Sequence, residues 1–132
     1  MTFLDSSTII HYLDGTEAIA EYLDEETSPP YLTSSLCVYE VLMGAVHTDG
    51  STDFGAERSR FGWVASVDLT EEIGIEAARL QEELKQTGDL LTPRDALIAA
   101  TARTAGDELV VVDSDFETAG LQDMMAVTVL PE

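Results

Sequence analysis

The chain has 132 residues, with 26 acidic residues against 6 Lys and Arg, and a formal net charge of -20 at pH 7. A hydrophobic content of 45% excludes an intrinsically disordered acidic chain, and the length is that of one ordinary domain. We therefore expect residues 1–132 to form a single domain. Because no apolar run is long enough for a membrane helix and no signal peptide is evident, we expect a cytoplasmic protein with no membrane partner.

The acidic residues are spread along the whole chain and form no acidic tail. Five of the six cationic residues are arginine, and Lys85 is the only lysine. This composition is typical of proteins adapted to molar salt, where the Debye length falls to ~3 Å and self-repulsion is screened. We predict a halophilic source, with an acidic mesophilic domain as the alternative. In dilute buffer such a charge disfavours nucleic acid as a partner, but molar salt weakens that argument.

Short strands and helices alternate along the sequence. Predicted strands are short apolar or β-branched runs: residues 3–4, 31–32, 64–69, 109–112 and 126–130. Predicted helices, caps included, cover residues 5–14, 16–27, 33–46, 54–61, 70–88 and 93–106. Residues 47–53 are polar and are predicted to form a loop. This order predicts a three-layer α/β/α fold with a mainly parallel five-stranded sheet.

Among so many acids, the informative ones lie in apolar surroundings. Asp5 follows the apolar pair Phe3–Leu4, and Glu40 is the only charged residue from Thr33 to Val46. Two more acids adjoin apolar runs: Asp95 opens the run 96–100, and Asp113 follows the run 109–112, with Asp115 two residues later.

Ligands bind to parallel α/β sheets at the carboxyl ends of the strands, where the strand order reverses. We expect Asp5, Glu40, Asp95 and Asp113 to converge there, because each lies just past a strand or in a helix that begins beside a strand end. Converging carboxylates repel one another unless a positive charge lies among them. Since the chain has few cations and a single Cys, Cys37, oxygen ligands to Mg²⁺ or Mn²⁺ are the expected solution.

Each acid also has an alternative interpretation. Asp5 and Asp95 are candidates for helix caps or first-turn acids that the helix dipole favours. Glu40 is alternatively the ion-pair partner of an arginine such as Arg94 or Arg103. These two arginines are candidates for phosphate or carboxylate partners, and surface ion pairing is the favoured role for both. Asp113 and Asp115 are equally candidates for turn residues. One cation site accounts for these placements together, whereas the alternatives need a separate reason for each.

Four segments resemble the PIN domain of VapC-type toxins, and they run the length of the chain. They are Leu4–Asp5–Ser6–Ser7 with Ile9–Ile10, Thr33–Ser34–Ser35 through Tyr39–Gly44, Asp95–Ala102, and Asp113–Ser114–Asp115–Phe116. The third segment is the most specific. One departure is Val111, where the family often has a threonine two residues before the last acid.

The resemblance implies an endoribonuclease that depends on Mg²⁺ or Mn²⁺ and is the toxin of a type II toxin–antitoxin pair. It implies that Asp5, Asp95 and Asp113, with Glu40, hold the metal and are catalytic, and that Asp115 is a further ligand. The expected products carry 5′-phosphate and 3′-hydroxyl ends. Ser6 and Ser7 are candidates for contacts to water, phosphate or a neighbouring carboxylate, or else cap the helix. The implied partners are RNA, a second copy of the chain in a homodimer, and an antitoxin whose tail covers the acidic cleft, often with an arginine.

Three other functions remain open at this point. A free-standing PIN nuclease of ribosomal RNA maturation or RNA decay has the same site. A phospho-receiver module is also a small α/β domain with clustered acids and Mg²⁺, but it needs a lysine late in the chain, and Lys85 lies inside a predicted amphipathic helix. A catalytically dead PIN fold used for binding is disfavoured because all four acids are retained.

Overall fold

A computed structural model describes residues 1–46, 50–106 and 108–131 of the chain; residues 47–49 of the predicted 47–53 loop lie outside the described part. Its five-stranded sheet comprises β1 (Thr2–Leu4), β2 (Tyr31–Ser34), β3 (Val64–Val67), β4 (Glu108–Val111) and β5 (Val127–Val129). The strand order is β3-β2-β1-β4-β5, and all four pairings are parallel. The predicted α/β class and sheet are thereby confirmed.

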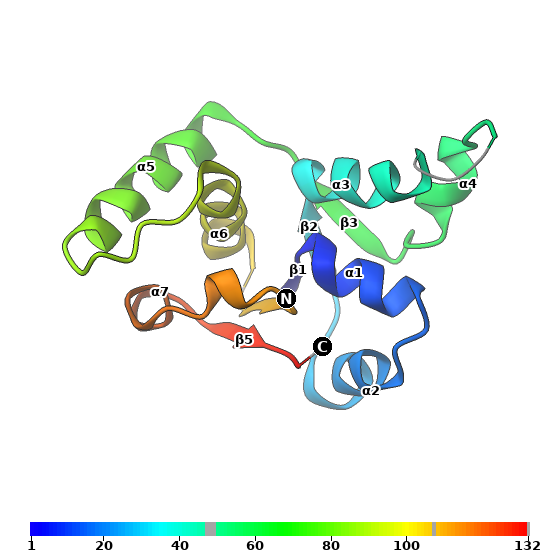
Figure 1. Cartoon of the computed structure of the whole chain (residues 1–132), viewed down its shortest axis with the longest axis horizontal. Coiled ribbons are helices and arrows are strands. Elements are labelled where there is room, and N and C mark those ends of the chain that lie inside the picture. Colours follow the sequence, from blue (N-terminus) through cyan, green and yellow to red (C-terminus); the bar gives the residue numbers. More distant parts are fainter. Residues whose placement is uncertain (47–49, 107, 132) are drawn as a thin grey trace.

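Helices cover both faces of the sheet (Figure 1). In the described part of the chain they are α1 (Ser6–Leu13), α2 (Glu17–Glu26), α3 (Ser35–Val46), α4 (Phe54–Ser59), α5 (Glu71–Lys85), α6 (Pro93–Ala105) and α7 (Ala119–Met124), with a short 3₁₀ helix η1 (Ser114–Phe116). None of the helices in these residues is long and apolar enough to cross a membrane.

The core has two parts because successive strand residues point to opposite faces of the sheet. Phe3 packs with α5, α6 and α7 on one face, whereas Leu4 packs with α1 and α2 on the other. In β4, Leu109 likewise belongs to the first cluster and Val110 to the second. Strands buried on both faces explain the continuous apolar runs in the sequence.

Two local predictions differ from the structure. β2 continues through Thr33 and Ser34, which were predicted to cap the following helix. Ser34 does cap α3 by accepting a hydrogen bond from the Cys37 amide, but the Thr33 hydroxyl donates to the Leu4 carbonyl and ties β2 to β1. The helices η1 and α7 were not predicted, because each is a short element in a segment of mixed polarity.

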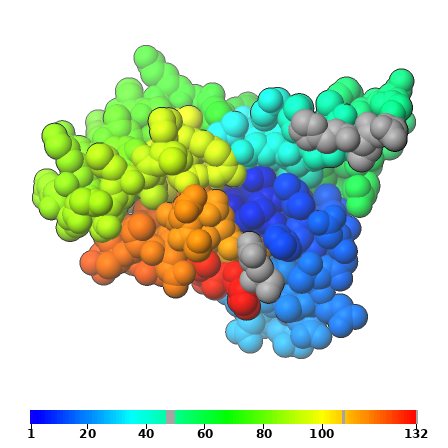
Figure 2. All heavy atoms as spheres, viewed as in Figure 1, coloured from blue at the N-terminus to red at the C-terminus, as the bar shows by residue number. Residues whose placement is uncertain are grey.

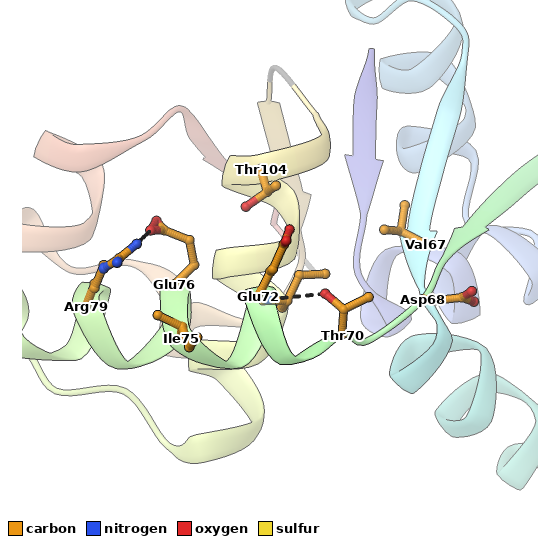
Figure 3. Close-up of a pocket in the computed structure, with 9 residues that line it drawn as sticks. Val67, Asp68, Thr70, Glu72, Ile75, Glu76, Arg79 and Thr104 are labelled. Carbon is orange, nitrogen blue, oxygen red and sulfur yellow. Dashed lines mark hydrogen bonds and ion pairs between the residues drawn. The ribbon is translucent and has the colours of Figure 1, made fainter.

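A surface pocket of about 530 Å³ lies between the start of α5 and the end of α6 (Figure 3). Val67 and Ile75 give it apolar walls, and Thr104 faces it from α6. Among its charged residues, Arg79 pairs with Glu76 at 3.1 Å, and Asp68 and Glu72 also line it. None of the acids predicted for the functional site lines this pocket, so the site lies elsewhere.

Candidate functional site

The strand order reverses at β1, since the chain proceeds outward through β2 and β3 and then returns to β4 on the other side of β1. Leu4 and Val110 are aligned in these neighbouring strands, so Asp5 and Asp113 both follow strand ends at the same edge. This is the position at which parallel α/β sheets bind ligands. In the space-filling view, the start of the chain, α6 and the segment after β4 adjoin on one face (Figure 2).

Asp5 is fully buried and is the N-cap of α1. Ser7 donates its hydroxyl to the two carboxylate oxygens of Asp5 at 2.7 and 2.8 Å, and the Thr8 amide donates at 3.0 Å. The Thr8 hydroxyl lies 3.0 Å from the same carboxylate and 2.9 Å from the Val110 carbonyl. Burial raises the pKa of Asp5 above its ordinary value, while these hydrogen bonds and, more weakly, the charge of Arg94 oppose the increase.

Ser7 also connects two elements. Its oxygen accepts a hydrogen bond from the Val112 amide at 3.1 Å, so one hydroxyl links α1 to the end of β4. The predicted contact of Ser7 to a neighbouring carboxylate is thus present, since its hydroxyl donates to Asp5, and a contact to water or phosphate stays a prediction.

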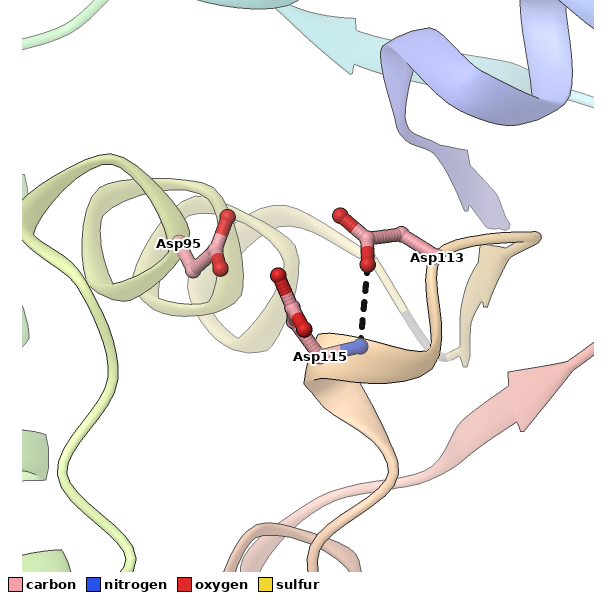
Figure 4. A group of neighbouring side chains, drawn as sticks. All are labelled: Asp95, Asp113 and Asp115. Atoms are coloured by element: carbon pink, nitrogen blue, oxygen red, sulfur yellow. Dashed lines mark hydrogen bonds between the residues drawn. The ribbon is translucent and has the colours of Figure 1, made fainter.

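Asp95, Asp113 and Asp115 form a cluster in which one carboxylate oxygen from each lies within 4.8 Å of the others. Their side chains point toward one another from α6 and from the turn after β4 (Figure 4). The turn is fixed because Asp113 caps η1 and accepts the Asp115 amide at 2.9 Å. Asp95 lies in the first turn of α6, and its amide donates to the hydroxyl of the N-cap residue Thr92 at 3.3 Å.

Asp95 is nearly buried, with 3% of its surface exposed. Burial raises the pKa of its carboxyl, and the charge of Asp113 acts in the same direction, while Arg94 acts against both. A positive charge beside the Asp95 carboxyl therefore favours its ionised form.

Arg94 supplies one such charge. Its Nε and one terminal nitrogen donate to the two oxygens of Glu40, the second contact at 2.8 Å, and the other terminal nitrogen donates to Asp95. The nitrogen that binds Glu40 Oε1 also donates to the Ser6 hydroxyl at 2.9 Å, and Ser6 donates to Glu40 at 2.9 Å. These contacts raise the pKa of Arg94, so the guanidinium is permanently charged.

The structure therefore supports part of each alternative interpretation. Asp5 is a helix cap, Asp95 is a first-turn acid, Glu40 is the partner of Arg94, and Asp113 is a turn residue. For Asp95 and Asp113 such roles do not exclude cation binding, because each carboxylate has more acceptor positions than these contacts use. Arg94 forms ion pairs, and its partners are the carboxylates of the acidic region, so that it joins α3, α6 and the start of α1 and does not form an isolated surface pair.

The three-aspartate cluster fits a hard divalent cation. It offers oxygen ligands from two elements at one edge of the sheet, and it contains no Cys or His among the residues that the structure describes. Asp5 and Glu40 lie at the same edge but are held by hydroxyl groups and by Arg94, and they are not part of this cluster. Their assignment as metal ligands stays a prediction.

The fold and the acid cluster together define an α/β domain with its candidate site at the reversal of strand order. The chain belongs to the PIN domain family, whose model matches residues 2–121. The family predicted from the sequence is thereby confirmed. Among the curated proteins, no sequence matches the chain.

Several solved structures are similar over nearly the whole chain. A toxin–antitoxin complex from Klebsiella pneumoniae has a TM-score of 0.76 at 21% identity, covering 98% of this chain and 97% of that chain. FitAcB from Neisseria gonorrhoeae has a TM-score of 0.77 at 21% identity and covers 96% of each chain. DNA-bound VapBC from Salmonella typhimurium has a TM-score of 0.73 at 25% identity, covering 97% of this chain and 96% of that chain. These likenesses agree with the fold that the family model indicates.

Proposed function

We propose that the chain is a divalent-cation-dependent endoribonuclease and the toxin of a type II toxin–antitoxin pair. The observation that carries the proposal is the convergence of Asp95, Asp113 and Asp115 at the edge where the strand order reverses. Membership of the PIN family and similarity to solved toxin–antitoxin complexes support it. The proposed products have 5′-phosphate and 3′-hydroxyl ends.

The proposed cation, Mg²⁺ or Mn²⁺, is held by Asp95 and Asp113, with Asp115 as a further ligand and with Asp5 and Glu40 beside them. Bound there, it would lower the pKa of a water molecule and neutralise negative charge on a scissile phosphate. The chain's own part is to hold the ligands in place. The Asp115 amide orients Asp113, and the Arg94 guanidinium orients Asp95 and Glu40. Ser7 and Thr8 keep the Asp5 carboxylate in one orientation.

The proposed partners are an RNA substrate, an antitoxin and a second copy of the chain. They follow from the resemblance and from the complexes named above. A free-standing PIN nuclease with the same chemistry remains the alternative, which a small antitoxin gene directly upstream would disfavour. A phospho-receiver needs a lysine late in the chain to hold the phosphoryl group. The only lysine, Lys85, is the exposed last residue of α5, which disfavours this alternative.

The proposed activity is tested by cleavage of a structured RNA in molar KCl with and without added Mg²⁺ or Mn²⁺. Asp95→Asn and Asp113→Asn should each abolish cleavage, because they remove charge from the cluster while preserving side-chain shape. The matched control is Asp123→Asn, which makes the same change at an exposed residue of α7 and should retain activity. Circular dichroism confirms that each variant is folded. Equal cleavage in excess EDTA would refute the proposal.

A further inference from the structure

Arg94 occupies a position that disfavours a cation. It is the second residue of α6, at the end of the helix whose partial charge is positive. The chain has only six Lys and Arg, and it places one of them here. An exposed ion pair would contribute too little to explain this placement. The reason must lie in the groups that Arg94 contacts.

Those contacts all belong to the proposed site. The guanidinium binds both oxygens of Glu40, donates to the Ser6 hydroxyl, and donates to Asp95. The exposed fractions of the side chains are 33% for Arg94, 23% for Glu40 and 5% for Asp95. Arg94 is thus the member of this set that solvent, and a dissolved ion, reaches most easily.

Asp95 takes part both in the ion pair with Arg94 and in the three-aspartate cluster. Its carboxylate is bound to Arg94, and it also supplies one of the oxygens of the three-aspartate cluster. A divalent cation in that cluster would lie close to a positive charge. We propose that Arg94 is a built-in counter-cation that neutralises Glu40 and Asp95 in the metal-free protein and competes with the divalent cation for Asp95. Arg94 thereby sets the ion concentration at which the site fills.

This inference rests on the proposed function, because it concerns the same cation site. Arg94 is a positioning residue in this account, since it acts through Asp95 and Glu40. Its removal should tighten cation binding. Even in bulk water, a unit positive charge about 6 Å from a divalent cation weakens binding by about tenfold. The expected effect of removing the charge is therefore a gain in affinity of about tenfold or more.

The test is calorimetric titration of the metal-free protein with Mn²⁺ at one fixed KCl concentration of about 0.1 M or below, where the Debye length of about 10 Å exceeds the distance between the two charges. Arg94→Gln should bind at least about tenfold more tightly than the natural chain, and Arg94→Lys, which keeps the charge, should bind within about threefold of it. Arg103→Gln is the matched control, because it removes the same charge from an exposed position later in α6. Equal or weaker binding by Arg94→Gln, relative to Arg103→Gln, would overturn the inference.

Two further measurements separate the possible failures. If the natural chain and Asp113→Asn bind Mn²⁺ equally, the cation site itself is wrong and the proposed function fails with it. A nuclear magnetic resonance titration of the natural chain with Mg²⁺ does not depend on the folding of any Arg94 variant. The Arg94 Nε–H signal should shift at the same Mg²⁺ concentration as the Asp115 amide. An Arg94 signal that stays unchanged while the Asp115 amide saturates also overturns the inference.

Discussion

Replacing Ser7 by alanine tests how the protein tolerates the buried Asp5 carboxylate. The Ser7 hydroxyl donates to Asp5 at 2.7 and 2.8 Å and accepts from the Val112 amide at 3.1 Å. A hydrogen bond to a charged group contributes about 1.5–3 kcal/mol, and an amide left without an acceptor costs about 1–3 kcal/mol. Because alanine is the better helix former, about 0.5 kcal/mol of this loss is offset. We therefore expect Ser7→Ala to lower the free energy of unfolding by about 2–5.5 kcal/mol.

Urea unfolding at fixed KCl and pH 7 measures this loss, and an unchanged m-value shows that both proteins unfold between the same states. The control is Ser59→Ala in α4, where the hydroxyl donates to the Gly55 carbonyl on an exposed surface. That change should alter stability by no more than about 0.5 kcal/mol. A loss for Ser7→Ala below about 1 kcal/mol, at unchanged m, would refute the proposed support of Asp5.

The same variant gives a signed pH dependence. The pKa of Asp5 is raised in the folded protein, so there is a pH window between its ordinary and its raised pKa. In that window the native state keeps a proton that the unfolded chain releases, and stability therefore falls as pH rises through it. Ser7→Ala removes a hydrogen bond that lowers the pKa, so the window extends to higher pH. The stability difference between the natural chain and Ser7→Ala should therefore grow as pH rises from below the ordinary Asp value. A difference that stays constant with pH would show that Ser7 does not act on the Asp5 charge.

Two other predictions concern charge. A double-mutant cycle with Glu40→Gln and Arg94→Gln in the metal-free protein should give a coupling free energy of about 1–2 kcal/mol by urea unfolding, because the pair is bidentate and partly buried. Coupling below about 0.3 kcal/mol would contradict it. RNA cleavage should increase from dilute buffer to molar KCl, since a net charge of -20 repels RNA until salt screens it. A steady decline in activity, while circular dichroism shows a folded protein, would be the contrary result.

The fold was predictable because the buried strands correspond to apolar runs in this sequence. The continuous run Leu109–Val112 corresponds to β4, whose residues Leu109, Val110 and Val111 are fully buried beneath helices on both faces. Pro93 begins α6 and Thr70 caps α5, as the helix-start signals indicated. The short elements after β4 leave a weaker trace. η1 has three residues and α7 has six, too few for a helical period to stand out.

The convergence of Asp95 and Asp113 was predictable, because an acid beside an apolar run needs a reason, whereas Asp5 and Glu40 were also expected in the cluster and are not part of it. Their partners were harder to predict. Arg94 was one of two arginines named as an alternative partner of Glu40, but the two residues are 54 apart, and neither local sequence shows that α3 and α6 bring them together. One sign was available, because Arg94 directly precedes the acid that opens an apolar helix. The hydrogen bond between the Val112 amide and the Ser7 hydroxyl, which in turn binds Asp5, was likewise not predictable, because the two residues are 105 apart in the sequence.

The acids at this edge of the sheet are stabilised in different ways, and the difference locates the remaining negative charge. Asp5 is buried but receives hydroxyl and amide donors from α1, and Glu40 receives a bidentate guanidinium. Asp113 receives the Asp115 amide, a neutral donor, while Asp95 shares Arg94 with Glu40. Asp5 and Glu40 receive more hydrogen bonds from the protein than the three-aspartate cluster does. The negative charge that the protein's own donors neutralise least therefore lies on Asp95, Asp113 and Asp115. A cation gains the most free energy where carboxylates converge with the fewest internal donors, since it then replaces repulsion by attraction. The internal hydrogen bonds of Asp5 and Glu40 thus favour the three-aspartate cluster as the place where the proposed cation would bind first.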